Sequence, residues 1–393
     1  MVISSIALGI FAMILSMGIM NGMNNQMVEN TISTSLGHIS IQHKKFRDEM
    51  KLGYSFVPGD ALYDSLNTVP DLVAWSPRIR LEGMIQSSEA SRGVLIMGID
   101  PDREKAISNI SSYMLPIDGN RYLTDAGSNE ILISRSMSDK LDIGLGDKVV
   151  LMFQDIHNDI TGVAFTVQGL YQSPIDSFDR YVVYTGIRIL ENRLGIPNRI
   201  SEISVRVSNR NVVDSVQRHI RTRLSGPDSN LAVLSWKDMA PNLLSAVKLF
   251  DTSMYIFFGI VFVTVIFSVA NTLIMAIMER FHEIGVMKSI GTRPSWVFGM
   301  VMFEAINLGL VGLAAGSLIG CAIVGILSIT GIDFSFYMES MRVWGTGHVI
   351  YPTLKPLNIV MAAAIVMATT LIAALYPAIK AARIRPLEAL HFV

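Results

Sequence analysis

Hydrophobic and polar positions follow two patterns along this chain, long apolar runs and short alternating segments. Four long runs, at residues 2–20, 255–278, 303–330 and 357–378, are almost free of charge. As helices, they are long enough to cross a hydrocarbon core of about 30 Å. Between the first two runs, short strand-like and helix-like patterns alternate with turn residues. The pattern predicts four transmembrane helices, with a large domain inserted between the first and the second.

The insert is predicted to be an α+β domain, since short strands are interleaved with amphipathic helices. Strands are expected at residues 38–42, 78–86, 93–99, 130–133, 148–153, 164–171, 181–184, 201–207 and 231–234. Helices are expected at residues 59–67, 135–141, 186–194 and 211–224. The chain therefore divides into residues 1–30 (first helix and stalk), 31–240 (the α+β domain) and 241–393 (stalk, three helices, a cytoplasmic helix and the C-terminal tail).

Composition supports a membrane protein. Hydrophobic residues make up 50% of the chain, charged residues only 17%, and mean hydropathy is +0.43. A net charge of −1 gives no indication of nucleic-acid binding. The single cysteine, Cys321, lies in an apolar run, so an intrachain disulfide is excluded.

Positive charges in the short loops predict the orientation. The loop between the second and third runs and the tail after the fourth each carry three, whereas residues 331–356 carry two. By the positive-inside rule, the first two regions and both termini are cytoplasmic and the insert lies outside. A cleaved signal peptide is the rival interpretation of the first run, but that run has neither a basic start nor a small-residue cleavage site.

Helical spacing of apolar residues continues past the ends of the first two runs. A helix over residues 241–278 would be about 57 Å long at 1.5 Å per residue, which exceeds the membrane core. The excess predicts a stalk or the wall of an apolar substrate cavity, and simple packing of the domain onto the membrane is the alternative. The residues concerned are Met20, Met23, Met27, Leu243, Val247, Phe250 and Met254.

Three glycines on the third run, Gly312, Gly316 and Gly320, form two overlapping G-x-x-x-G steps. Such a row lets another helix approach closely. Whether that helix belongs to this chain is left open by the sequence.

Motifs for catalysis are missing. The sequence has no Gly-Lys dipeptide and hence no Walker A loop for ATP. His282-Glu283 begins a zinc-protease motif, but Val286 occupies the position of the second histidine. His38 and His43 have no third ligand nearby, so no metal site is predicted. We expect a non-catalytic chain without a cofactor of its own.

A charged module lies between the second and third runs. Phe281, Ile284, Met287 and Ile290 recur at three-residue spacing and predict a short amphipathic helix, which Gly291 ends. A helix lying on the membrane surface would show the same pattern without any partner.

The sequence of this module, E-R-x-x-E-I-G-V-x-K-x-I-G at residues 279–291, resembles the FtsX-like permeases. So do Y-P-A at 376–378 and A-A-R-I-R-P-L-E-A-L at 381–390. These permeases are membrane subunits of ABC transporters and include MacB-like and lipoprotein-releasing (Lol-type) groups. G-I-D-P at 98–101, I-L-I-S at 131–134, G-D-K-V at 146–149 and F-D-R-Y-V-V-Y at 178–184 are most similar to the lipoprotein-releasing branch.

The resemblance implies partners and roles. Residues 279–291 would be the coupling helix that seats on a cytoplasmic ABC ATPase dimer, which binds ATP and Mg²⁺. A second permease, identical or paralogous, would complete the complex in the bacterial inner membrane, with the α+β domain in the periplasm. Its substrate would be a lipoprotein released from the membrane lipid toward a periplasmic carrier. The implied coupling residues are Glu279, Arg280, Glu283, Ile284, Gly285, Lys288 and Gly291.

Two departures from the family are visible. The hairpin that docks a carrier in one Lol-type subunit corresponds here to the short stretch 154–163, which favours a non-docking subunit or a system without a carrier. The basic stretch that precedes the first span in the family is absent, as a late start codon would produce. The alternatives are a MacB-like or FtsX-like mechanotransmitter, which drives efflux or activates cell-wall hydrolases, and a membrane-anchored sensor without an ATPase.

Overall fold

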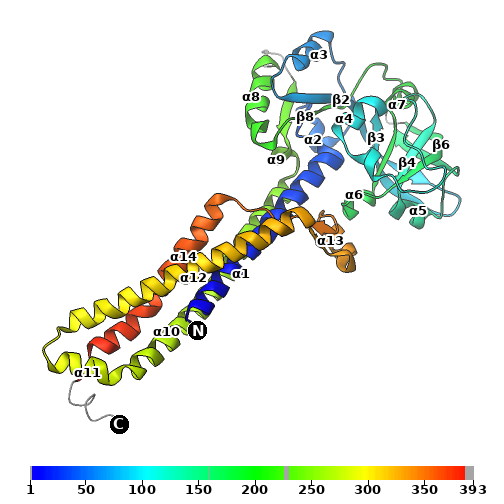
Figure 1. Cartoon of the computed structure of the whole chain (residues 1–393). Helices are drawn as coiled ribbons and strands as arrows, with labels where there is room; N and C mark the ends of the chain where they lie inside the picture. The colour runs from blue at the N-terminus through cyan, green and yellow to red at the C-terminus, as the bar shows by residue number, and fades with distance from the viewer. Residues whose placement is uncertain (1, 158, 225–229, 386–393) are drawn as a thin grey trace. The chain divides into compact units, whose positions relative to one another are not determined.

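The computed structural model of the chain describes residues 2–157, 159–224 and 230–385 (Figure 1). These residues form two units. One joins the chain up to Asn25 to Ala246–Phe334 and to the chain from Val349 onward, and the other joins Gln26–Ser245 to Ser335–His348. The segment Ser335–His348 follows the third apolar helix in sequence, yet it packs with the α+β domain. Residues 386–390 of the C-terminal motif lie outside the described residues.

Four helices are long and apolar enough to span a membrane, as the hydropathy pattern predicts. Each extends beyond its predicted run. Prolines at the first position of the third and fourth helices suit a helix start, and Gly331 ends the third with φ of 74°. The helices are α1 (Val2–Thr31), α10 (Pro241–Glu279), α12 (Pro294–Thr330) and α14 (Pro356–Ala382), and the shorter α11 (Phe281–Ser289) lies between α10 and α12.

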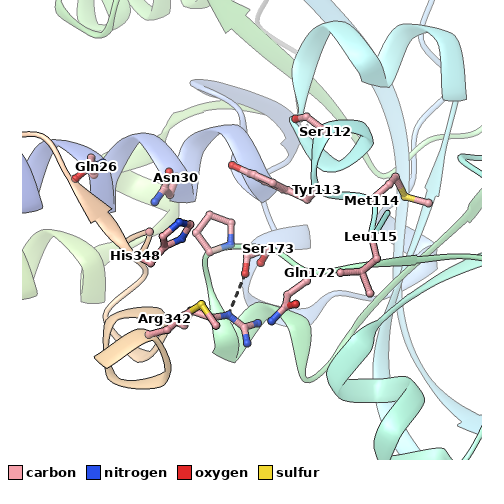
Figure 2. Close-up of a pocket in the computed structure, with 13 residues that line it drawn as sticks. Gln26, Asn30, Ser112, Tyr113, Met114, Leu115, Gln172, Ser173, Arg342 and His348 are labelled. Atoms are coloured by element: carbon pink, nitrogen blue, oxygen red, sulfur yellow. Dashed lines mark hydrogen bonds between the residues drawn. The ribbon is translucent and has the colours of Figure 1, made fainter. Parts of the chain in front are cut away.

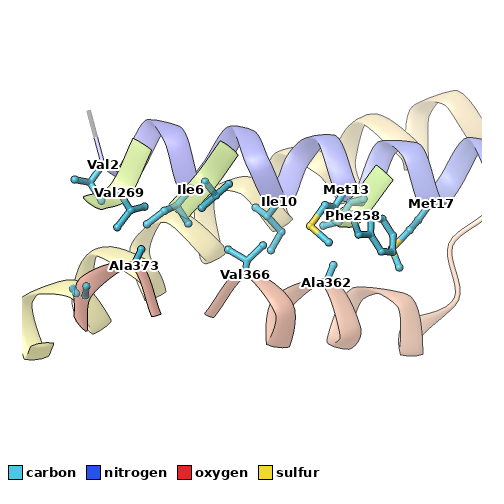
Figure 3. Close-up of a cluster of buried hydrophobic side chains, with 14 of the residues drawn as sticks. Val2, Ile6, Ile10, Met13, Met17, Phe258, Val269, Ala362, Val366 and Ala373 are labelled. Atoms are coloured by element: carbon cyan, nitrogen blue, oxygen red, sulfur yellow. The ribbon is translucent and has the colours of Figure 1, made fainter. Parts of the chain in front are cut away.

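One face of α1 forms the core of the helical unit. Ile6, Ile10 and Ile14 are fully buried, and their four-residue spacing places them on a single face. Figure 3 shows this face of α1 above Val366 and Ala373 of α14. Ser268 Oγ of α10 also donates to Ser5 Oγ of α1 at 2.7 Å.

The α+β domain is built on one nine-stranded sheet with the order β3-β7-β4-β6-β5-β2-β8-β1-β9. An additional pairing between β2 and β3 closes the first six strands into a barrel, and β2, β8, β1 and β9 continue as an antiparallel sheet. The strands are β1 (Ile39–His43), β2 (Leu72–Gln86), β3 (Ser91–Ile99), β4 (Glu130–Ser134), β5 (Lys148–Gln154), β6 (Ile160–Tyr171), β7 (Val182–Gly186), β8 (Glu202–Val207) and β9 (Leu231–Ser235).

All nine predicted strands are present, and β2 begins six residues earlier than the pattern indicated. Its 15 residues serve both parts of the sheet, because Leu72–Arg78 pairs with β8 while Arg78–Gln86 pairs with β3. Pro77 lies just before the pairing with β3 begins at Arg78. A proline is tolerated in a strand where its missing N–H breaks no ladder bond.

Short helices cover the sheet, and the four predicted ones are present within a few residues. The seven-residue α4 was not predicted. Its start signal is clear in the structure, where the Asp100 carboxylate accepts from the N–H groups of Asp102 and Arg103. The helices are α2 (Phe46–Glu49), α3 (Asp60–Asn67), α4 (Pro101–Ile107), α5 (Arg135–Leu141), α6 (Asp176–Asp179), α7 (Ile187–Leu194), α8 (Val213–Leu224), α9 (Trp236–Met239) and α13 (Met338–Val343).

Candidate functional site

The predicted coupling module forms α11, which is anchored through one face. Ile284 is 2% exposed and packs in a cluster with Ile277 of α10 and Val297 of α12. Gly285 beside it is also buried. The helix ends at Ser289, and Gly291 follows with φ of 99°. Ile284 and Gly285 therefore hold α11 against α10 and α12.

Lys288 belongs to the same anchor. Its Nζ donates to the backbone oxygens of Ala382 at 2.9 Å and Ile384 at 2.5 Å. These carbonyls lie at and just beyond the end of α14, where a helix leaves its oxygens without intrahelical partners and carries partial negative charge. The lysine thus ties α11 to the end of α14.

The outer surface of the module is charged and partly apolar. Glu279, Arg280, Glu283 and Gly291 are exposed. Arg280 Nη1 also lies 3.5 Å from the Glu304 carboxylate, which gives that acidic residue on α12 a partner. The opposite charges offset part of the cost of placing Glu304 within an apolar helix.

The predicted apolar face of α11 is wrong at its last position, because Ile290 is 79% exposed. Three-residue steps of about 100° per residue bring the ninth residue after Phe281 to the opposite side of a helix. Ile290 also lies beyond the last helical residue. With Trp296, which is 73% exposed, it adds apolar surface next to the exposed charges.

The glycine row of α12 faces a helix of the same chain. A β-carbon on Gly312 would lie 2.8 Å from the side chain of Ile6, and one on Gly320 would lie 3.2 Å from that of Ile14. One on Gly316 would collide with Ile10. The three glycines therefore match, turn by turn, the buried isoleucines of α1.

A second glycine pair was missed from the sequence, although Gly18 and Gly22 on α1 also form a G-x-x-x-G step. Gly22 faces the backbone of Tyr351 and Pro352, and Thr353 N–H donates to Gly18 O at 2.9 Å. Small residues thus let α1 accept an extended segment as well as a helix.

The residues proposed for the stalk are only partly covered within one chain. Met27 is 4% exposed, whereas the other six are half-buried. The row is not purely apolar, because Asn24 Nδ2 of α1 donates to Asp251 Oδ1 of α10 at 3.3 Å. The half-buried six are Met20, Met23, Leu243, Val247, Phe250 and Met254.

The end of α1 is held by the α+β domain through a π-helical turn, η1 (Ile32–Leu36). Its last four carbonyls each accept a hydrogen bond from a different part of the domain. The donors are Asn109 N to Ser33 O at 2.8 Å, Tyr184 Oη to Thr34 O at 3.2 Å, Arg78 Nη1 to Ser35 O at 2.5 Å and Ser204 Oγ to Leu36 O at 3.3 Å. We call this set the α1 clamp, and it satisfies oxygens that a helix end leaves without partners.

Arg78, one of the clamp donors, is itself part of a buried charge network. Its guanidinium makes a two-bond contact with Glu104, at 3.1 and 2.6 Å, and lies 3.5 Å from Glu202. Arg80 pairs with the second oxygen of Glu202 at 3.1 Å. Arg78, Glu104 and Glu202 are each at most 1% exposed. Burial alone would raise the pKa of Glu202, but Arg80 and Arg78 outweigh it and lower that pKa.

A second buried ion pair fixes Ser335–His348 to the domain. Arg342 Nη2 lies 2.5 Å from Asp179 Oδ2, and Arg342 Nε donates to Ser173 O at 3.2 Å. Asn30 on α1 donates to Gly345 O at 3.0 Å. Burial raises the pKa of Asp179 to about 6, against the opposing effects of Ser173 and Arg342.

His38 and His43, the two histidines considered as metal ligands, lie in different surroundings. Burial, with Arg206 and Arg210 nearby, lowers the pKa of His38 from 6.5 to about 4. His43 stacks on Tyr54 with ring centroids 4.9 Å apart, and its Nδ1 accepts from Lys45 N.

Comparisons with known proteins agree with this architecture. A family model described as the MacB-like periplasmic core domain matches residues 1–223, and one described as the FtsX-like permease C-terminal matches residues 255–386. The lipoprotein-releasing system transmembrane protein LolC of Xylella fastidiosa is 22% identical over 99% of this chain and 92% of its own length. LolE of Haemophilus influenzae, named for the same system, is 20% identical over 98% and 92%.

Among solved structures, the periplasmic region of MacB from Actinobacillus actinomycetemcomitans matches 56% of this chain and 97% of that chain, at 14% identity and a TM-score of 0.37. The core-domain model alone covers more than half of the sequence. Together with the four apolar helices and the FtsX-like C-terminal match, it shows that the chain belongs to the MacB-like and FtsX-like family of ABC transporter permeases.

Proposed function

We propose that this permease extracts lipoproteins from the outer leaflet of the bacterial inner membrane and releases them toward the outer membrane. The observation that carries the proposal is the similarity to LolC and LolE, which extends over nearly the whole chain and thus over both units. The motifs at 98–101, 131–134 and 178–184 lend support. Asp100 caps α4, which carries Glu104, the partner of the clamp donor Arg78. Ser134 and Asp179 lie at the Arg342 ion pair, and Tyr184 is a donor of the α1 clamp.

In this proposal the exposed charges of residues 279–291, namely Glu279, Arg280 and Glu283, form the cytoplasmic docking surface for an ABC ATPase dimer. The positive residues Arg280, Lys288 and Arg293 near α11 favour that orientation. ATP and Mg²⁺ bind in the ATPase, whereas this chain supplies mechanical coupling and no catalytic group. The large domain then lies in the periplasm, and a second permease, identical or paralogous, faces this one.

The contacts around α11 suggest how ATP-driven movement reaches the spanning helices. A push on the exposed face is passed to α10 and α12 through Ile284, and to α14 through Lys288. α1 packs against α12 through the glycine row and runs without a break to Thr31, where the clamp begins. A displacement of the spans is therefore applied to the periplasmic domain through α1.

An apolar receiving surface is needed as well as ATP. Transfer of acyl chains costs about 0.8 kcal/mol per CH₂ group, so three chains exposed to water would cost tens of kcal/mol. The half-buried stalk residues, such as Met23 and Val247, have apolar surface left for acyl chains or for the second permease. In this proposal they line the path that the lipid anchor takes.

Glu283→Lys tests the proposal. In proteoliposomes that contain the permease, its ATPase and a labelled lipoprotein, reversal of this exposed charge should reduce both lipoprotein-stimulated ATP hydrolysis and release by at least about tenfold. Glu89→Lys, at an exposed position of the domain, is the matched control and should leave both unchanged.

Full activity of the Glu283→Lys complex would contradict docking at α11. A different result would refute only the substrate. If Glu283→Lys reduces ATP hydrolysis but the wild-type complex releases no lipoprotein under any condition, the lipoprotein substrate is wrong and MacB-like mechanotransmission becomes the better assignment.

A further inference from the structure

A cavity of about 460 Å³ lies within the α+β unit (Figure 2). Arg342, which pairs with Asp179, forms part of its wall. Its volume is in the range of ligand sites, about 300–1,000 Å³. Three separate parts of the unit line it: the last turns of α1, residues 112–115 with 172–174, and the segment 338–348. Figure 2 shows Asn30, Tyr113, Gln172 and His348 around the opening.

The polar lining is rich in neutral hydrogen-bonding groups. Gln172 contributes an amide and Tyr113 a hydroxyl, and neither side chain has a hydrogen-bond partner among the described residues. The charge of Arg342 is already compensated by Asp179. Leu115, Pro174 and Met338 add apolar surface. Such a lining suits an uncharged chain with alternating donors, acceptors and apolar side chains, as a polypeptide has.

The backbone at Met114 offers a strand edge to such a chain. Gln172 N donates to Tyr113 O at 2.9 Å, and Leu115 N donates to Leu170 O at 3.0 Å. Met114 is therefore the non-hydrogen-bonded partner of Tyr171 in this antiparallel bridge. Its own N–H and C=O point to the other side, and neither makes a hydrogen bond within the described part of the chain. With φ of −62° and ψ of 134°, Met114 has extended backbone ready to pair.

We infer that this cavity binds an extended polypeptide segment by strand addition at Met114, with Gln172 and Tyr113 completing its hydrogen bonds. We assign the segment as the linker that follows the lipid anchor of a substrate lipoprotein, and this assignment rests on the proposed function. Main-chain pairing recognises a peptide with little regard to sequence, which suits a transporter that handles many lipoproteins. Because Arg342 and His348 form part of the wall, a bound linker would also touch Ser335–His348.

Photo-crosslinking of the full permease complex tests the inference. Benzoylphenylalanine replaces Leu115 in the cavity or, as a control, Tyr181, which is 45% exposed and outside the lining. The probes are a triacylated lipopeptide with a neutral linker rich in serine and asparagine and the same peptide without lipid. We expect the Leu115 site to form adducts with linker residues of both probes, and the Tyr181 site to form none.

Two variants examine the proposed hydrogen bonds. Met114→Pro removes the backbone N–H, together with the Met114 side chain, at a φ value that proline favours, and the adduct yield should fall about tenfold. Should Met114→Pro fail to fold, Tyr113→Phe combined with Gln172→Ala removes two side-chain groups without intrachain bonds and should give a similar loss. An adduct yield unchanged in a folded Met114→Pro variant and in the double variant would overturn strand addition.

The identity of the adduct separates this inference from the proposed function. Adducts only with acyl chains, phospholipid, or the permease itself would overturn the peptide site, even in a complex that releases lipoproteins. Capture of both linkers by a complex that releases no lipoprotein would support a peptide site and refute only the proposed function.

Discussion

The two helices that enter and leave the α+β domain are attached to it in different ways. α1 ends in the α1 clamp, where four successive carbonyls are bound by four separate donors. α10 begins at the exposed Pro241, after the four-residue α9 and the non-helical Ala240. The entry to α10 is held chiefly by a capping box between Ser235 and Asp238 and by the buried Trp236.

The difference concerns how each helix transmits movement. Four bonds in different directions resist both rotation and sliding of the end of α1. A single short turn before α10 leaves a backbone position, Ala240, that can change its dihedral angles without breaking a network. We therefore expect α1 to act as the lever on the domain and Ala240 to act as a hinge.

Glycine insertions give the largest expected effect. Two glycines between Thr31 and Ile32 should abolish the proposed lipoprotein release, because they uncouple α1 from the α1 clamp at residues 33–36. The same insertion between Ala240 and Pro241 should preserve about half of the activity, since lengthening a flexible connection costs little. Release from proteoliposomes measures this, and thermal unfolding checks that both variants are folded. An equal loss of release activity in both insertion variants would contradict the distinction between α1 as a lever and Ala240 as a hinge.

Arg78→Met is expected to destabilise the domain by about 3–5 kcal/mol, because it leaves Glu104 and Glu202 buried with too little positive charge. Arg80→Met is the matched control. Arg80 is 20% exposed and pairs with Glu202 alone, so its removal should cost less than half as much. Urea unfolding of the full chain in detergent, followed by tryptophan fluorescence, measures both. A larger loss of stability in Arg80→Met than in Arg78→Met would mean that Arg80, and not the clamp donor Arg78, is the main partner of the buried carboxylates.

Arg342→Met should have a smaller effect that depends on pH. At pH 8 Asp179 is ionised, and loss of its partner should cost about 3 kcal/mol. As pH falls through about 6, Asp179 takes up a proton and needs a partner less, so the cost of Arg342→Met should shrink. In the wild type, the raised pKa means that protonation of Asp179 adds stability below pH 4, and this contribution is lost as pH rises through 6.

Unfolding of the wild type and of Arg342→Met between pH 5 and pH 8 tests the sign of this dependence. The double variant with Asp179→Asn is the control, because it has no group left to titrate at this position. A cost that stays constant between pH 5 and pH 8 would mean that Asp179 does not titrate in this range.

The sequence predicted elements better than the contacts among them. Long apolar runs and strand alternation depend on local pattern, which is why α10 was correctly expected to be continuous from Pro241. The closure of the barrel by β2 and β3 was not visible, because β2 changes partners along its length. No local signal marks that change, apart from Pro77 at the junction.

The candidate site shows the same limit. The sequence identified Lys288 as part of a charged module, but only the structure shows that it caps α14 instead of facing outward. Arg78 and Glu202 were each within or beside a predicted strand, yet their pairing spans 124 positions and leaves no periodic pattern. The motif at 178–184 was noted as a resemblance, and the structure gives it a physical basis in Asp179 and Tyr184.

The α1 clamp has a consequence for biosynthesis. Its four carbonyls lie at residues 33–36, whereas the donors come from Arg78, Asn109, Tyr184 and Ser204. When α1 has been synthesised, the end of the helix still lacks its donors, and the last bond waits until more than 160 further residues have been added. Contacts of such sequence separation form slowly. The newly made chain therefore completes the α1 clamp only when β8 has been made, and a chain that stops before Ser204 would leave the oxygen of Leu36 without its donor.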